Sequence, residues 1–148
     1  MRAALIKIDG VAERLGRGVR AVEAMVDGGD LVDGGLVWVF DLAKTDTRRE
    51  LRFWLREVEA RASDRGQFHK LANWELDWVL AQILPPSKKF FQAGEVDHLF
   101  QIRHNTRLEF GAELNGNLTN GANTYARANL VAFLTRRWLG AVYDRKTI

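Results

Sequence analysis

The segment from residue 103 to residue 107 holds the side chains with the clearest chemistry in this chain. Two arginines flank a histidine, an asparagine and a threonine, namely Arg103, His104, Asn105, Thr106 and Arg107. An arginine can donate two hydrogen bonds to the major-groove edge of guanine, and an asparagine can pair in the same way with adenine. We therefore expect this cluster to open an exposed helix whose side chains can contact the bases of a DNA duplex.

Polar residues elsewhere in the chain extend this candidate surface. Asn120 and Asn123 fall in a predicted turn and Arg127 follows it, which suits contact with the DNA backbone or the minor groove. Near the other end of the chain, Arg17 and Arg20 could face a phosphate, but a run of acidic residues follows and opposes it. That run comprises Glu23, Asp27, Asp30 and Asp33. The sequence therefore favours the C-terminal cluster as the part that reads DNA.

No residue pattern indicates catalysis, a metal or a bound cofactor. His98 has a carboxylate, Glu95, three residues before it, but nothing nearby completes a metal-ligand set. The chain has no cysteine, no phosphate-binding glycine loop and no nucleophile motif. Three carboxylates lie where we predict the start of a helix, and this position explains them without a nuclease site: Asp41, Asp46 and Glu50. We therefore predict a protein that is not an enzyme and that needs no metal or cofactor.

The elements that would position these residues form a pattern near the N-terminus. Apolar residues recur every three or four positions from residue 11 to residue 26, which predicts two short amphipathic helices. Glycines at positions 16 and 18 supply a tight turn between them. A glycine pair at 34–35 then predicts a hairpin whose second strand, residues 36–40, is apolar on both faces. Such a strand requires protein on both sides.

The same order of features returns near the C-terminus. We predict helices from about residue 92 to 101 and from about 103 to 114, a hairpin at Asn120-Gly121, and a last helix from about 128 to 142. Val96 occupies the position that Val11 has in the first copy, and Gly116 occupies that of Gly29. The two copies therefore share one register apart from about two inserted residues.

Two further helices are predicted between the copies. Apolar residues recur at helical spacing from Leu51 to Val58, which predicts a helix that begins at Thr45 or Thr47. Residues 67–84 carry too much apolar surface for a helix with one wet face, so we expect a buried spine. Three tryptophans fall on these apolar stripes and one falls on the stripe of the last helix, which favours a place in the core for all four: Trp54, Trp74, Trp78 and Trp138.

Composition and charge are compatible with this organisation. The 148 residues carry a net charge of +3, and the cationic surplus lies in residues 85–148, with nine basic against five acidic side chains. Because a polyanion responds to local potential, this surplus also favours the second copy. The absence of cysteine, and an aspartate at position 9 before any long apolar run, predict a cytoplasmic protein without a signal peptide or membrane span. We expect a mainly α-helical fold with two small β-hairpin wings, divided into units at 1–45 and 88–148 joined by a helical segment at 46–87.

Both copies resemble the winged helix-turn-helix of the excisionase and MerR-like superfamily. The first copy matches that pattern at Val11-Ala12-Glu13, Leu15-Gly16, Val22 and Gly29-Asp30-Leu31. The second matches at Glu95-Val96, Leu99-Phe100, Thr106, Gly116-Asn117-Leu118 and the helix that follows the turn, Ala128 to Leu134. Two departures are Ala21-Val22 in place of a Thr-Val pair, and Gln101 in place of the glycine after the first helix.

The resemblance implies tandem winged helix-turn-helix units that bind double-stranded DNA, with the second helix of each unit in the major groove. It also implies a role in phage or mobile-element biology, in recombination directionality, transcription regulation or DNA packaging, as in excisionases and small terminase subunits. Two arrangements stay open: both units bind successive grooves, or the N-terminal unit packs against the spine or a partner such as a second copy or a phage or recombination protein. A different class of function is an oligomerisation or adaptor module whose units bind protein.

Overall fold

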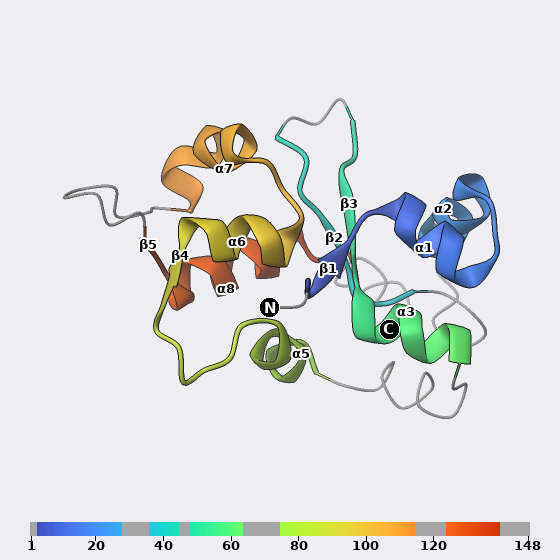
Figure 1. Ribbon diagram of the computed structural model, residues 1–148, viewed down its shortest axis with the longest axis horizontal. Helices are drawn as coiled ribbons and strands as arrows, with labels where there is room; N and C mark the ends of the chain where they lie inside the picture. The colour runs from blue at the N-terminus through green and yellow to red at the C-terminus, as the bar shows by residue number, and fades with distance from the viewer. Residues whose placement is uncertain (1–2, 28–35, 45–47, 64–74, 115–123, 140–148) are drawn as a thin grey trace, which may run out of the picture. The chain divides into compact units, whose positions relative to one another are not determined.

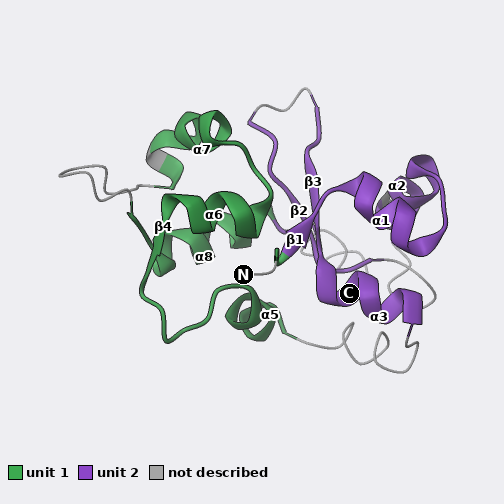
Figure 2. Ribbon diagram, viewed as in Figure 1, with its two compact units in different colours: residues 1–4, 75–137 green, residues 5–74, 138–148 purple. Residues whose placement is uncertain are grey.

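The computed structural model describes residues 3–27, 36–44, 48–63, 75–114 and 124–139 (Figure 1). Within these residues helices are the main element and the strands form small antiparallel sheets, as the sequence predicts. The chain divides into two compact units, shown in purple and green in Figure 2, which we call the N-terminal and C-terminal units. The N-terminal unit comprises residues 5–74 with 138–148, and the C-terminal unit comprises residues 1–4 with 75–137. The boundaries expected after residues 45 and 87 stay predictions.

A three-stranded antiparallel sheet forms the centre of the N-terminal unit. Its strands are β1 (Leu5–Ile6), β2 (Val39–Asp41) and β3 (Leu51–Trp54), in the order β1-β3-β2 (Figure 1). On the central strand, Phe53 lies opposite Ile6 on one side and Val39 on the other. All four residues of β3 are buried, so the strand is covered on both faces.

Three helices accompany this sheet. They are α1 (Ile8–Leu15), α2 (Val19–Asp27) and α3 (Leu55–Ser63), and α1 contacts α2, α3 and β3. The first two helices and the turn between them confirm the sequence prediction. Val11 and Val22 are fully buried, so the apolar stripes that the spacing indicated face the interior of the unit.

The helix predicted to begin at Thr45 or Thr47 is wrong in its first half. Leu51–Trp54 form β3, and α3 begins only at Leu55. The apolar residues at 51, 54, 55 and 58 have the spacing of a helix. Residues 51–54 nevertheless form a strand, because β1 and β2 hydrogen-bond to their backbone on both sides. The apolar strand predicted at residues 36–40 therefore pairs, through β2, with β3. The predicted glycine turn at 34–35 lies outside the described residues.

The apolar segment from Leu36 to Phe40 is buried throughout, as predicted. Trp138 stacks on Trp38 with ring centroids 5.2 Å apart, and its indole nitrogen donates a hydrogen bond of 2.9 Å to the Val37 carbonyl oxygen. Trp138 is also bridged to Phe40 in antiparallel fashion. The last helix therefore ends at Arg137, before the predicted limit near 142, because the chain leaves it to join the N-terminal unit.

The C-terminal unit contains the same kinds of element. They are α5 (Leu76–Ile83), β4 (Phe90–Gln92), α6 (Ala93–Phe100), α7 (His104–Phe110) with a short 3-10 turn at Gly111–Glu113, β5 (Thr124–Ala126) and α8 (Arg127–Arg137). Strands β4 and β5 pair antiparallel, and the predicted hairpin at Asn120-Gly121 lies outside the described residues. Helices α6 and α7 confirm the two that the sequence predicts.

Aromatic rings fill the core of the C-terminal unit. The ring of Phe133 on α8 lies 6.1 Å from that of Phe100 and 4.9 Å from that of Phe110. Leu80 and Ile83 of α5 are also buried, but Trp78 on the same helix is 42% exposed. The expectation of a spine without a wet face is therefore wrong for residues 76–83, and residues 67–74 lie outside the described residues. The prediction that Trp78 belongs to the core is therefore wrong, because α5 keeps one face toward solvent.

The two units repeat one order of elements at one spacing. In each, a strand leads into a helix, a turn and a second helix, and a later strand pairs with the first and runs directly into another helix. A single offset in residue number places α1 on α6 at both ends and the start of α2 on the start of α7. The turn residues at the end of α1 and α6, Gly16 and Gln101, both adopt the left-handed conformation, with φ of 64° and 53°. The glycine that the second copy lacks is thus replaced by a glutamine in the same backbone conformation.

Replacing Gly16 by glutamine is expected to lower the free energy of unfolding of the N-terminal unit by about 1 kcal/mol, the usual cost of the left-handed conformation for a residue with a Cβ. No atom lies within 4 Å of a Cβ built on Gly16, so the effect reports backbone strain. Denaturant titration followed by tryptophan fluorescence measures it. Gly18 has equally open surroundings without a positive φ, so Gly18→Gln is the control, and an equal loss from both variants would contradict the expectation.

Candidate nucleic-acid interface

The start of α7 presents most of the predicted cluster to solvent. Arg103 precedes the first turn in an extended conformation, and its side chain is exposed. His104 and Asn105 are exposed as well, while Thr106 is half-buried. Arg103, His104 and Asn105 are therefore exposed at the start of α7, as the sequence predicts, whereas Thr106 faces solvent only in part.

Arg107 does not protrude with its neighbours. Its side chain is only 2% exposed, and its Nε donates a hydrogen bond of 2.7 Å to Asp97 on α6. One terminal nitrogen lies 2.6 Å from the hydroxyl of Tyr125 on β5, and the other lies 2.7 Å from Nδ1 of His104. The expectation that Arg107 protrudes toward a duplex is wrong, because this guanidinium is used to tie α7 to α6 and β5.

The environment of Arg107 keeps it charged. Burial lowers its pKa, but hydrogen bonds to Tyr125 and Asp97 together with the negative charge of Asp97 raise it above the ordinary value. A buried cation that is paired and hydrogen-bonded on three sides holds its neighbours in one geometry. Arg107 is thus a positioning residue for the exposed front of α7.

The N-terminal unit has apolar side chains at the positions of this polar cluster. The corresponding residues, in the shared spacing and strand pairing, are Ala12 for Asp97, Val22 for Arg107 and Phe53 for Tyr125. All three apolar residues are buried. Helix α2 is therefore held by apolar packing where α7 is held by an ion pair.

Helix α2 and the turn before it carry exposed cations. Arg17 and Arg20 are both exposed, and a terminal nitrogen of Arg17 lies 4.0 Å from the sulfur of Met25. Glu23, one turn after Arg20, is exposed on the same helix. The second helix of the N-terminal unit thus carries one cation, Arg20, and two acids, Glu23 and Asp27, with Arg17 in the turn before it.

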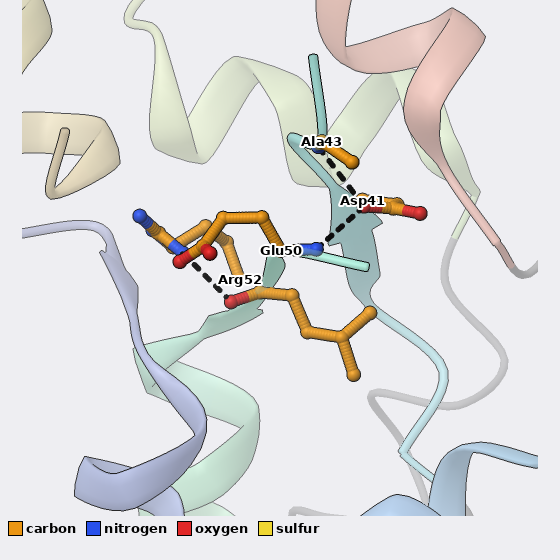
Figure 3. A network of polar contacts seen from close by, with 5 residues as sticks. Asp41, Ala43, Glu50 and Arg52 are labelled. Carbon is orange, nitrogen blue, oxygen red and sulfur yellow. Dashed lines mark hydrogen bonds and ion pairs between the residues drawn. The ribbon is translucent and has the colours of Figure 1, made fainter. Parts of the chain in front are cut away.

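The connection between β2 and β3 is a second cationic feature, one that the sequence prediction lacks. Lys44, Arg48 and Arg49 are exposed on this connection. Figure 3 shows how its two ends are held: Oδ1 of Asp41 accepts hydrogen bonds of 3.0 Å from the Ala43 amide and 2.9 Å from the Glu50 amide. The signal in the sequence was a polar run between two apolar runs, which is typical of a hairpin.

The carboxylates of this region serve the hairpin. Asp41 caps backbone amides at the end of β2, and Glu50 pairs at 2.7 Å with Arg52, whose side chain is 4% exposed (Figure 3). The explanation of Asp41 and Glu50 as residues at a helix start is therefore wrong, since a strand follows them. Asp46 lies outside the described residues.

The remaining predicted contacts lie in the C-terminal unit. Arg127 is half-buried, and its Nε donates a hydrogen bond of 2.7 Å to the carbonyl oxygen of Leu84. Asn120 and Asn123 lie outside the described residues. Arg127 has part of its guanidinium committed to the fold, which makes it less available for a contact with the DNA backbone.

The described residues show neither a metal cluster nor a membrane segment. Within them, no three histidine or acidic side chains lie together as metal ligands would, and no helix combines the length and apolar character needed to cross a membrane. Glu95 accepts a hydrogen bond of 3.0 Å from the Gln92 amide and pairs with Lys88. These contacts, that of Lys88 first, lower the pKa of Glu95, which fits a helix cap.

No protein-family model, curated protein or solved structure matches this chain. The candidate interface therefore depends on its own geometry and on the repetition of that geometry in both units.

Proposed function

We propose that this protein binds double-stranded DNA without catalysing a reaction, with α2 and α7 as the helices that enter the major groove. One observation carries the proposal: each unit repeats a strand, a helix, a left-handed turn and a second helix with exposed polar side chains. A short helix presented in this way fits the width of the major groove. In this proposal the units are tandem winged helix-turn-helix modules.

The distribution of cations favours binding by both units. The N-terminal unit exposes Arg17 and Arg20 near α2 and three further cations on the β2–β3 connection. The C-terminal unit exposes Arg103 at the front of α7 but keeps Arg107 inside. This balance supports the alternative in which both units contact DNA, over one in which the N-terminal unit only packs against protein.

The process that this binding would serve follows from the resemblance to winged helix-turn-helix proteins. Recombination directionality, transcription regulation and DNA packaging all require a small protein that marks a DNA site without cutting it. Each is compatible with the proposed activity.

The full chain is expected to bind duplex DNA with an affinity that falls steeply as salt is added, because phosphate neutralisation releases counterions. Arg17→Ala and Arg103→Ala should each weaken binding and reduce the slope of log K against log salt by about 0.9 for each phosphate that the variant leaves unneutralised. Fluorescence anisotropy with a labelled random-sequence duplex at several salt concentrations measures both quantities. Arg136→Ala is the control for charge, since that exposed arginine pairs with Glu113 on another part of the unit. Binding that ignores salt, or an equal loss from Arg136→Ala, would exclude the assignment.

A protein-binding adaptor is the second candidate, and one observation favours it. The C-terminal unit exposes three large apolar side chains, Trp78 at 42%, Phe90 at 62% and Leu108 at 44%. Exposed apolar residues are used at protein interfaces. Light scattering of the full chain with and without duplex DNA separates the candidates, because the adaptor associates with protein and leaves DNA unbound.

A further inference from the structure

We infer that the two second helices select different base pairs, α2 a G·C pair and α7 an A·T pair, so that one chain recognises two unlike half-sites. The inference rests on the proposed DNA binding and names what each helix reads. It follows from two pairs of exposed residues at equivalent positions of the two helices. These pairs are Arg20 with Glu23 on α2 and Asn105 with Leu108 on α7.

The shared spacing makes these positions equivalent. Arg20 and Asn105 are each the second residue of their helix, and Glu23 and Leu108 each follow three residues later. Residues three apart on a helix lie on one face. Each helix therefore presents one pair of side chains, from matching positions, to the same kind of ligand.

Buried neighbours fix which face of each helix points outward. Val22 and Val26 turn inward on α2, at 0% and 1% exposure. Arg107 and Phe110 turn inward on α7, at 2% and 7% exposure. All four residues of the two equivalent pairs are exposed, including the apolar Leu108.

The chemistry of the two pairs is complementary to different bases. On α2, arginine suits the two acceptors of guanine and glutamate accepts from the amino group of cytosine. On α7, asparagine suits adenine and an apolar side chain suits the methyl group of thymine. Base recognition thus accounts for two features that phosphate binding leaves unexplained, an acid at Glu23 on a helix that approaches a polyanion and a leucine exposed at position 108.

Selection of bound duplexes from a random pool by the full chain tests the inference, followed by sequencing. The wild type should enrich one G·C block and one A·T block, with each preferred base favoured by roughly 5- to 150-fold. Reciprocal exchanges carry the test: Arg20→Asn with Glu23→Leu should convert the G·C block to A·T, and Asn105→Arg with Leu108→Glu should do the reverse. Should an exchange fail to fold by circular dichroism, the single substitution Asn105→Arg, at an exposed position, replaces it with the same expected change at one base.

The outcomes separate this inference from the proposed function. Bound DNA whose enriched sequences stay the same after both exchanges overturns the inference and leaves DNA binding intact. Enrichment of a single block, or of two blocks of the same composition, by the wild type overturns it as well. No retained DNA at low salt overturns the proposed function and the inference together.

Discussion

Replacing Arg107 by valine is expected to destabilise the C-terminal unit by about 3 kcal/mol, because removal of one partner leaves an uncompensated charge in a mostly buried site. Asp97 would lose its ion pair at 2.7 Å with its side chain only 21% exposed, and the Tyr125 hydroxyl would lose its partner. Hydrogen exchange of the α6 and α7 amides, followed by mass spectrometry, measures the local loss. Valine is the residue that the N-terminal unit has at the equivalent position, Val22.

The matched control transfers the whole apolar set. Asp97→Ala, Arg107→Val and Tyr125→Phe together copy the side chains that the N-terminal unit buries. Replacing a complete buried ion pair by packed apolar groups is often neutral or stabilising, so this triple variant should stay within about 1 kcal/mol of the wild type. A triple variant as unstable as Arg107→Val would show that loss of packing, and not the stranded carboxylate, causes the effect.

Raising the pH from 4.5 to 8 is expected to lower the free energy of unfolding of the N-terminal unit by about 3 kcal/mol through Glu57 alone. Complete burial raises the pKa of this carboxyl to about 7 from 4.5, although hydrogen bonds from the Val37 and Trp38 amides, each 3.0 Å, lower it in part. A folded-state pKa above the unfolded value means that the neutral form favours the fold. The contribution is therefore fully present below pH 4.5 and is lost as the pH rises through about 7.

Glu57→Gln isolates this contribution, because glutamine stays neutral at every pH. Urea titrations followed by tryptophan fluorescence report on the N-terminal unit, where the Trp38 amide contacts Glu57 directly. At pH 4.5 the variant should be less stable than the wild type, because the glutamine NH2 group must lie against one of the two backbone N–H donors. Its free energy of unfolding should then change less than that of the wild type between pH 4.5 and 8. Parallel pH curves for wild type and variant would refute the assignment to Glu57.

The helix pairs α1–α2 and α6–α7 were predictable because their signal is local. The spacing of Val11, Leu15, Val22 and Val26 lies within a few turns, and the same holds for α6 and α7. Strand β3 was not predictable in this way, since its spacing also fits a helix and the decision depends on pairing with residues 5–6 and 39–41, which are distant in sequence.

The candidate site was also predictable only where its signal is local. The exposure of Arg103 and Asn105 follows from their place at the front of a helix, but the burial of Arg107 depends on Tyr125, 18 residues away on β5. One signal was present in the sequence, because the register pairs Arg107 with Val22, an apolar position. The cations between β2 and β3 escape prediction because the spacing of the strand that follows them also fits a helix.

The stacking of Trp138 on Trp38 has a consequence for the order of synthesis. The N-terminal unit receives a ring and a hydrogen bond from a residue 101 positions after Val37, beyond the entire described C-terminal unit. A ribosome that has released the chain only as far as residue 74 has therefore made all three described strands of that sheet but not the tryptophan that stacks on Trp38. Maturation of the first-made unit must wait until the other unit has been synthesised.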